Sequence, residues 1–348
     1  ALCSAELEAL ARMVERDEGD FTGQPSTPLL VNAKPPEDEP EPVSLAKLWN
    51  DYVKARTTAG FMKDGGRRQR PVIESLRKFL GHSDARKVTR KDLMSWRDDL
   101  LNRISAKTVA GIYLSTIRTL WAWAVENDRL SENVAENVKQ AKPKRQRSRD
   151  PGYSDKEAIA ILNASRAYEP TPDPFGHIRE HETTIAAKRW APILCAFSGA
   201  RISEILQLRK ADVFQEGDRW VMRISPDAGT VKAGDFRDVP IHQQIVALGF
   251  LDHVKAAKTG PLFNSSTDPA KSARSAQRQS ERLAAWLHEQ ELVPEGLQPN
   301  HAWRHRLKTQ ARDLGLDMRI VNAIQGHSDK DMSDGYGTVS LTAKARVI

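Results

Sequence analysis

The chain has 348 residues, enough for two domains with a buried core, and is 39% hydrophobic and 28% charged. Its longest apolar run, around residues 193–197, is too short for a membrane span. No signal segment opens the chain, and because it begins at Ala1 rather than Met we expect a processed or expressed fragment of a longer protein. Cys3 and Cys195 have no metal-like or disulfide-like spacing, which fits a reducing cytosol.

The net charge of +7 is unevenly distributed along the chain. Residues 1–43 carry 3 basic and 10 acidic side chains, residues 44–150 carry 24 and 12, and the remainder carries 26 and 24. A basic module is typical of a protein that binds a polyanion, most often nucleic acid. A membrane-binding surface or a solvated lysine-rich surface would have a similar composition.

The first 43 residues are predicted to be an acidic N-terminal tail and linker. A short helix is expected near residues 4–14. Residues 20–43 contain six prolines and an acidic run at 37–41, a composition that cannot bury a core. We therefore expect an extended linker there.

Residues 44–138 have the pattern of a helical, DNA-binding domain. Apolar residues recur at helical spacing from Leu45 onward, and amphipathic stretches follow at 72–80, 93–101 and 109–125. Thr89 and Ser105 are suitable N-caps for the last two. The pattern predicts four helices with a basic exterior.

A basic linker and a second domain complete the expected organisation. Within the linker, residues 139–150, the stretch "KQAKPKRQRSR" holds six basic residues in eleven, which suggests contact with an anion. Residues 151–348 are mostly helical in pattern, with one β region in which Trp220, Met222 and Ile224 alternate with other residues. A hairpin turn is expected at 232–235. The predicted fold class is mainly α with a small β-sheet.

Two segments of the second domain place cations at the starts of helices. In "FSGARISEILQL", Gly199 ends one helix and Arg201 lies in the first turn of the next, where free N–H groups favour an anion. Glu204 either caps this helix or orients Arg201, and capping is the simpler interpretation. In "PNHAWRHRLKTQARDLGLD", Asn300 is the expected cap, the buried face carries Trp303, Leu307 and Leu314, and Gly315 ends the helix.

On the second of these helices, His301 and Arg304 are expected as i, i+3 neighbours on the exposed face. His305 lies one step off that face and is less expected to share a site. A pair of this kind is more often ordinary surface than a functional site.

A third segment, "GHSDKDMSDGYG", places His327 and Tyr336 nine residues apart in a polar loop. An exposed loop tyrosine is its simplest interpretation when the segment is taken alone. Together, however, the three segments supply the groups that phosphodiester chemistry needs. Arginine forks match phosphate oxygens, a phenol can serve as nucleophile, and lysine or histidine can protonate a leaving oxygen.

In this order and spacing, "SGARISEILQL", "HAWRH" and "GHSDKDMSDGY" resemble the signature boxes of the tyrosine recombinases, the phage-integrase type of site-specific recombinase. The resemblance covers about residues 154–336. It implies a mixed α/β catalytic domain in residues 151–348, preceded by a helical core-binding domain. One departure is Gln325, where an apolar residue is usual.

The resemblance also implies roles for six catalytic residues. Arg201 and Arg304 would hold the scissile phosphate, with His301 beside them as proton acceptor or phosphate contact. Lys232 would protonate the leaving 5′ oxygen, and His327 would hydrogen-bond the phosphate. Tyr336 would attack to give a 3′-phosphotyrosyl intermediate.

The function implied is site-specific DNA recombination or integration, independent of metal, ATP and any small-molecule cofactor. The expected partners are double-stranded DNA and three further copies in a homotetramer on paired sites, with no membrane. The expected location is the bacterial cytoplasm, with a phage or mobile element as source. Alternatives are a type IB topoisomerase-like enzyme, a catalytically inactive DNA-binding protein of the same fold, and a metal-dependent nuclease using His177 and His181.

Overall fold

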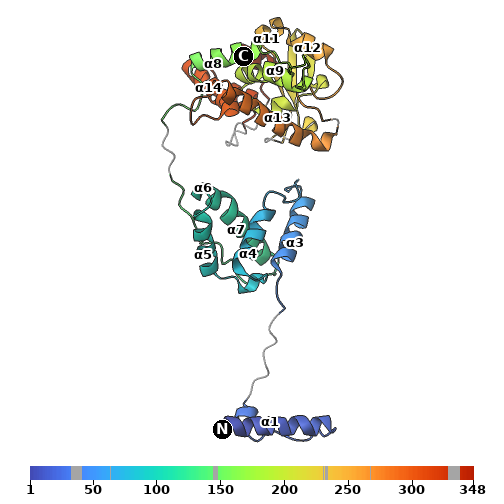
Figure 1. The fold of residues 1–348 in the computed structure, drawn as a ribbon, viewed down its shortest axis with the longest axis vertical. Coiled ribbons are helices and arrows are strands. Elements are labelled where there is room, and N and C mark those ends of the chain that lie inside the picture. Colours follow the sequence, from blue (N-terminus) through green and yellow to red (C-terminus); the bar gives the residue numbers. More distant parts are fainter. Residues whose placement is uncertain are drawn as a thin grey trace. The chain divides into compact units, whose positions relative to one another are not determined.

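The computed structural model describes residues 1–32, 41–62, 64–143, 148–229, 231, 234–266, 268–327 and 338–348. The chain divides into two compact units, Ala1–Gln146 and Arg147–Ile348 (Figure 1). Both are built mainly from helices, and the second contains a three-stranded sheet. The expected fold class, mainly α with a small sheet, is confirmed. Within the described ranges, no helix is long and apolar enough to cross a membrane.

The first unit contains only helical elements among its described residues. In chain order these are α1 (Leu2–Asp17), α2 (Pro28–Val31), α3 (Leu45–Thr58), α4 (Arg70–Leu80), the 3-10 turn Ala85–Lys87, α5 (Arg90–Leu101), α6 (Ala106–Thr108), the π-helical turn Val109–Tyr113 and α7 (Leu114–Glu126).

The acidic tail has more structure than its composition predicts. The carboxylate of Glu8 in α1 accepts hydrogen bonds from Ser26 and Thr27, which lie just before α2. These bonds fold the chain back on α1. The expectation of an extended linker throughout 20–43 was therefore wrong for the segment around α2, because the Glu8 carboxylate binds the two residues immediately before that short helix.

The helices from α3 to α7 enclose one hydrophobic cluster. Leu45, Trp49, Trp96 and Trp121 are each at most 2% exposed within it. The helix starts follow local sequence signals, since Thr89 forms a complete capping box with Asp92 and the Ser105 side chain accepts from the N–H of Thr108. Both predicted caps are confirmed.

The second unit combines helices with three strands. Its elements are α8 (Asp155–Arg166), α9 (Glu182–Ser198), α10 (Ile202–Leu206), the 3-10 turn Lys210–Asp212, β1 (Val213–Glu216), β2 (Arg219–Ile224), the 3-10 turn Pro226–Ala228, β3 (Arg237–Pro240), α11 (Gln243–Ala247), α12 (Phe250–Ala256), α13 (Pro269–Glu289), α14 (Pro299–Asp313), α15 (Met318–Gln325) and α16 (Leu341–Val347).

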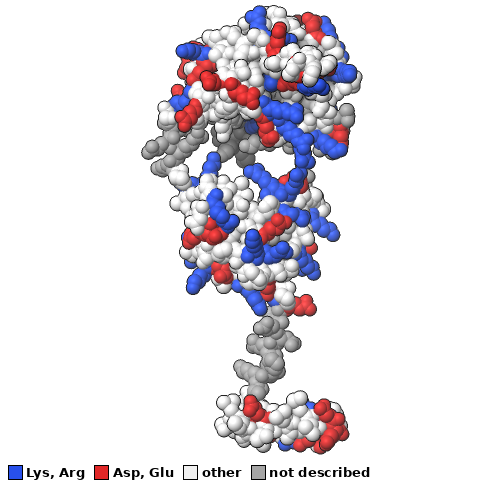
Figure 2. Space-filling model, in the orientation of Figure 1, with Lys and Arg blue, Asp and Glu red and all other residues white. Residues whose placement is uncertain are grey.

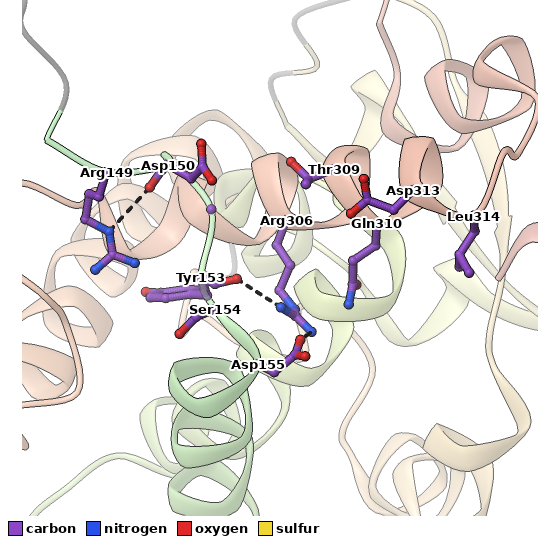
Figure 3. A pocket seen from close by; sticks show the side chains of 11 residues that line it. Arg149, Asp150, Tyr153, Ser154, Asp155, Arg306, Thr309, Gln310, Asp313 and Leu314 are labelled. Atoms are coloured by element: carbon purple, nitrogen blue, oxygen red, sulfur yellow. Dashed lines mark hydrogen bonds and ion pairs between the residues drawn. The ribbon is translucent and has the colours of Figure 1, made fainter.

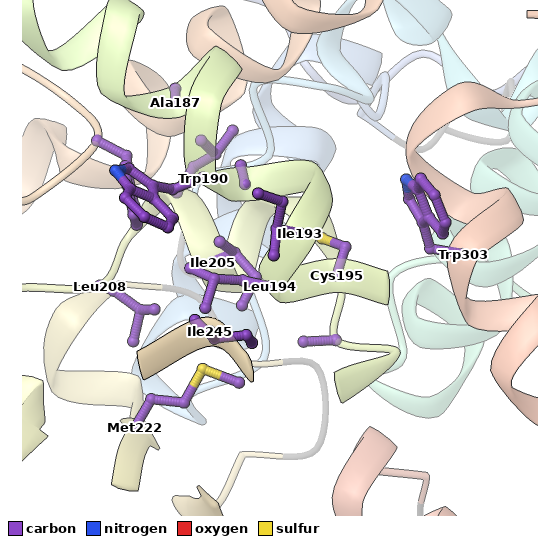
Figure 4. Packing of buried hydrophobic residues seen from close by; sticks show 14 of the residues in the cluster. Ala187, Trp190, Ile193, Leu194, Cys195, Ile205, Leu208, Met222, Ile245 and Trp303 are labelled. Atoms are coloured by element: carbon purple, nitrogen blue, oxygen red, sulfur yellow. The ribbon is translucent and has the colours of Figure 1, made fainter. Parts of the chain in front are cut away.

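Helix α9 runs through the core of this unit and contacts α8, α10, α13 and α14. Ile193, Leu194 and Cys195 are at most 3% exposed, and their side chains pack with residues of α10, α11 and the sheet (Figure 4). The helix ends at Gly199, which adopts a left-handed conformation with φ of 57°. Its backbone N–H donates to the carbonyl of Cys195, a common way to close a helix.

The sheet is antiparallel in the order β1-β2-β3. The alternation around Trp220 correctly predicted β2, whose Met222 and Ile224 are 2% exposed. Its last residue, Ile224, pairs with Arg237, the first residue of β3. The register therefore places Arg237 at the end of the sheet where β2 finishes and β3 begins.

Helix α16 packs on β3 and α15. Its Lys344 is 8% exposed and donates from Nζ to the carbonyl of Asp238 at 2.9 Å. The side chain thus satisfies a backbone acceptor of β3 while its stem covers the core.

Gly199→Ala should destabilise the protein more than Gly315→Ala. Both glycines have positive φ, 57° and 64°, which costs alanine about 1–2 kcal/mol. Only at Gly199 would a Cβ also lie 2.5 Å from Nε2 of Gln325 and 2.8 Å from Cδ2 of Leu307, adding roughly 1–3 kcal/mol of crowding. Urea unfolding of the two variants measures the difference, and equal losses would contradict this packing.

Candidate active site

The N-terminus of α10 is held by one buried carboxylate. Glu204 is 3% exposed, and its Oε2 accepts from the backbone N–H of Arg201 at 3.1 Å. Its Oε1 accepts from Nη1 of Arg201 at 2.9 Å. The two functions that the sequence left as alternatives, capping the helix and orienting the arginine, are both performed by Glu204.

A second arginine reaches the same carboxylate from the sheet. Nη2 of Arg237 donates to Oε2 of Glu204 at 2.6 Å, and its Nε donates to the carbonyl of Ile324 at 2.9 Å. Arg237 is 8% exposed. It therefore joins β3, α10 and the end of α15 through two hydrogen bonds in the protein interior.

Helix α14 contributes Arg304, which is 4% exposed. Its Nη1 donates to the carbonyl of Gly199 at 2.8 Å and to the carbonyl of Gln325 at 2.6 Å. These acceptors lie at the ends of α9 and α15, where helix carbonyls lack partners within the helix. Arg304 was expected on an exposed face; that expectation was wrong because both helix ends close over the guanidinium.

Other expectations for α14 also need correction. Asn300 does not cap the helix, since α14 begins at Pro299 and the Asn300 side chain donates to the carbonyl and hydroxyl of Ser280. Leu314 is 73% exposed rather than buried, because the helix ends at Asp313. Trp303 is buried as predicted, at 2% exposure.

His327 lies directly after the end of α15 and meets Arg304. The distance from Nε of Arg304 to Nε2 of His327 is 3.2 Å. A guanidinium only donates hydrogen bonds, so Nε2 is the acceptor and the imidazole in this arrangement carries its proton on Nδ1. Gly326 makes the turn between helix and histidine, with φ of 66°.

Gln325, the departure from the family pattern, is fully buried beside this pair. Its side-chain Nε2 donates to the backbone carbonyl of Arg304 at 2.9 Å. Its own backbone carbonyl accepts from the Arg304 guanidinium. The polar residue thus fits its position by fastening the end of α15 to α14.

His301 lies one helical turn before Arg304, in the first turn of α14, and is exposed. Its ring meets that of His305 edge-on, with centroids 4.9 Å apart. His305, which seemed less suited to a shared site, is therefore the ring neighbour of His301.

The outer side of α14 is fixed by the segment that leads into α8. The Tyr153 hydroxyl donates to the carbonyl of Pro299, and its ring lies 4.8 Å from that of Trp303. In Figure 3, Arg306 of α14 reaches the carbonyl of Tyr153 and the carboxylate of Asp155 across a cavity of about 650 Å³. These contacts attach α14, the helix that carries Arg304, to the segment before α8.

The cluster holds more positive than negative charge. Around Glu204, burial raises the carboxyl pKa, but the charge and hydrogen bond of Arg237, with the bonds from Arg201, outweigh burial and leave it below the usual value. Burial, followed by the charge of Arg201, lowers the pKa of Arg304 to about 10, so that its guanidinium remains protonated at neutral pH. An anion placed here would relieve the repulsion between the arginines.

Two guanidinium nitrogens in this cluster still have donor capacity. Nη2 of Arg304 and Nη1 of Arg237 are buried and have no hydrogen-bond partner within the described ranges. Buried donors are nearly always satisfied in folded proteins. A phosphate oxygen is the type of acceptor that an arginine fork matches.

Two of the six candidate residues, Lys232 and Tyr336, lie outside the described residues. Of the other four, Arg201 and Arg304 interact electrostatically, Arg304 bonds His327, and His301 lies on the same helix. The described contacts therefore bring the three sequence segments together.

Sequence reasoning missed the structural importance of Arg237 and Gln325. Arg237 is the first residue of "RDVP", two positions before Val239. In a strand these two side chains lie on the same face, where an apolar residue is expected at both positions. Gln325 follows the apolar residues Val321 and Ile324 at the end of a helix. In both cases a polar residue occupies a position where the local pattern predicts a buried apolar one. That mismatch was the signal that could have identified these residues.

Arg149, His177 and His181, which the sequence offered as anion or metal contacts, make local hydrogen bonds in the structure. Arg149, expected against an anion, forms a two-bond ion pair with Glu157. His181 caps α9, and the N–H of His177 donates to Asp173. No three His, Cys, Asp or Glu side chains gather as a metal site in the described ranges.

Comparison with known proteins agrees with this arrangement. Residues 177–341 match the model of the phage integrase family. The tyrosine recombinase XerC of Bradyrhizobium diazoefficiens is 31% identical over 163 residues, which are 45% of this chain and 47% of that protein. The chain thus spans about half the length of this curated relative.

Two solved structures share the fold. A lambda integrase tetramer bound to a Holliday junction aligns with a TM-score of 0.60 and 15% identity, covering 96% of this chain and 90% of that one. The Tn1549 transposon integrase in complex with a circular intermediate DNA aligns with a TM-score of 0.57 and 17% identity, covering 87% and 97%. Residues 177–341 therefore resemble the phage integrase family, and the two solved structures share the fold of the chain.

Proposed function

We propose that this protein is a site-specific DNA recombinase that cuts and rejoins duplex DNA through a 3′-phosphotyrosyl intermediate. The observation that carries the proposal is the cluster of Arg201, Arg237 and Arg304 with the buried carboxylate of Glu204, the acidic partner that the described residues supply. Three guanidinium groups with one carboxylate leave a positive site for a phosphodiester. The match of residues 177–341 to the phage integrase family supports DNA as the source of this phosphate.

Arg201 and Arg304 would bind the non-bridging oxygens of the scissile phosphate. Their value is greatest when the phosphorus is pentacovalent and its oxygens carry the most charge, because donors fixed in advance need no reorganisation. His327, now hydrogen-bonded to Arg304, would turn its protonated nitrogen toward the same phosphate. His301 would accept a proton nearby.

Tyr336 and Lys232 would complete the chemistry. The Tyr336 oxygen forms a bond to phosphorus as its proton passes to a base such as His301, and the bond from phosphorus to the 5′ oxygen breaks. Lys232 gives a proton to that leaving oxygen. Because one phosphoester replaces another, the step needs no ATP, and reversal with another strand's 5′ hydroxyl completes the exchange.

The helical unit would supply a DNA-binding surface. Figure 2 shows lysine and arginine side chains at several places on the face of residues 44–138, among acidic and other residues. The exposed ones in the described part are Lys47, Lys54, Arg67, Arg68, Arg70, Arg77, Lys78, Lys87, Arg90, Lys91, Arg103, Lys107 and Arg129. Such a surface suits the phosphate backbone. The basic linker at 139–150 would join it to the catalytic domain, residues 151–348.

The lambda integrase tetramer on a Holliday junction suggests how copies would assemble. By analogy, four copies of this chain would act on two paired sites, in the cytoplasm of a bacterium that carries the mobile element. The acidic residues 1–43 would take no part in gripping DNA, because their charge repels phosphate.

Arg201→Ala and Arg304→Ala should separate binding from catalysis. We expect each to bind DNA within about tenfold of wild type yet to lose at least about 10²-fold in cleavage, because the lost interactions are strongest in the transition state. Arg319→Ala is the matched control, an arginine on α15 whose side chain is 70% exposed and paired with Asp317.

Binding is measured by titration of labelled duplex and cleavage by single-turnover gel assay, with thermal unfolding to check that Arg304→Ala is folded. Loss of binding with unchanged cleavage per bound complex would contradict the assigned roles.

Lys232→Ala should be rescued by a substrate in which sulfur replaces the scissile 5′ oxygen. Sulfur leaves without protonation, so a missing general acid no longer matters. Cleavage of the two substrates by wild type and variant is compared in the same gel assay. Equal defects on both substrates would assign proton donation to another residue.

A further inference from the structure

Arg237 is a buried cation outside the set of residues to which family resemblance assigns a role. It lies at the start of β3, five residues after Lys232 in the sequence. Its contacts, Glu204 on one side and the Ile324 carbonyl on the other, are both to parts of the site. They link it to Arg201 through Glu204 and to His327 through the end of α15.

The first link depends on charge. Glu204 is 1% exposed at its side chain, and a carboxylate so buried is stable only if it is paired. Arg237 makes the shortest ion pair to it, at 2.6 Å, compared with 2.9 Å for Arg201. An ionised Glu204 can hold both the backbone and the guanidinium of Arg201. A neutral one would lose the charge in both bonds.

The second link depends on space. A Cβ added to Gly326 would lie 2.7 Å from Cζ of Arg237, so the backbone of this turn rests on the guanidinium itself. The Arg237 bond to Ile324 fixes the last turn of α15 immediately before it. His327 is the next residue after Gly326, and its position therefore depends on Arg237.

We propose that Arg237 is a positioning residue of the recombinase site, which keeps Glu204 ionised and fixes the turn at Gly326, and thereby orients Arg201 and His327. This inference rests on the proposed function for its catalytic consequence. The ion pair itself is a property of the folded protein and can be tested without catalysis.

Several groups besides Arg237 face Glu204 and bear on its titration. Arg201 lies on the same helix, Arg304 approaches from α14, and the Cys195 thiol from α9. Lys344 of α16 interacts electrostatically with Arg237. Arg237 is the strongest of the charges that lower the pKa of Glu204, so its removal should let burial raise that pKa.

The test uses the full chain with Arg237→Met and Arg237→Lys. Arg223→Met is the matched control, since Arg223 lies on the neighbouring strand and makes its own two-bond pair with Asp238, with 42% of its side chain exposed. Formation of the covalent protein–DNA adduct is followed in single turnovers from pH 5.5 to 8.5.

Arg237→Met should slow adduct formation by about 10²-fold at pH 7, the cost of misplacing reacting groups by about 1 Å. The loss should grow as pH falls, because Glu204 becomes protonated at the raised pKa, whereas the wild type shows no such added loss. Arg237→Lys should restore much of the pH profile but not the full rate, because one ammonium cannot span both acceptors. Arg223→Met should stay within about threefold of wild type.

Thermal unfolding from pH 4 to 7.5 tests the ion pair independently. In the wild type the folded pKa of Glu204 is lowered, so its contribution to stability is present above the unfolded value and is lost as pH falls. In Arg237→Met the pKa is raised, so the variant is most destabilised at neutral pH. The melting temperatures of the two proteins should therefore converge on acidification.

In proteins that carry Glu204→Gln, the gap in melting temperature caused by Arg237→Met should instead stay constant across the pH range, because no carboxylate titrates at position 204. A constant gap between wild type and Arg237→Met, or an adduct profile for Arg237→Met parallel to that of wild type, would overturn the proposal. Absence of adduct from the wild type would instead refute the proposed function, while the unfolding curves would still decide whether Arg237 keeps Glu204 ionised.

Discussion

The candidate site of the second unit depends on the buried carboxylate of Glu204. Within the part of the chain that the structure describes, it is the acidic group that interacts with three arginines, which come from the start of α10, from β3 and from α14. Without it, the repulsion among these cations in a poorly solvated interior would oppose folding. With it, two arginines are held in fixed directions, and a net positive charge remains for a ligand. The same group thus serves stability and function.

Helix ends supply the remaining contacts. The carbonyls of Gly199, Ile324 and Gln325 lie at the C-termini of α9 and α15, and each accepts from Arg237 or Arg304. A cation at a helix C-terminus satisfies free carbonyls and interacts favourably with the helix dipole. Both helices end in glycines with positive φ, which lets the chain turn away while the arginine remains close. Segments more than a hundred residues apart are joined in this way.

The sequence was most informative in its short motifs and local patterns. The motifs selected Arg201, His301, Arg304 and His327 as candidates, and Arg304 interacts with both Arg201 and His327 in the fold. Local pattern predicted β2 and the caps at Thr89 and Ser105. Burial of Arg304 was not predictable, because helical periodicity assigns a charged residue to the exposed face unless its tertiary partners are known. The burial of Arg237 and Gln325 also depends on tertiary partners, which are the Glu204 carboxylate and the Ile324 carbonyl for Arg237 and the Arg304 carbonyl for Gln325. Asn300 does not cap α14, because its side chain donates a hydrogen bond to the carbonyl of Ser280 on another helix.

The central claim is that Tyr336 forms a covalent bond with DNA. We would incubate the wild type and Tyr336→Phe, in chelator, with a nicked duplex carrying the recombination site of the element. A denaturing gel then detects protein attached to a 3′ end. The account predicts a metal-independent adduct from the wild type alone. Tight binding by both proteins with no adduct, or an adduct from both, would contradict it.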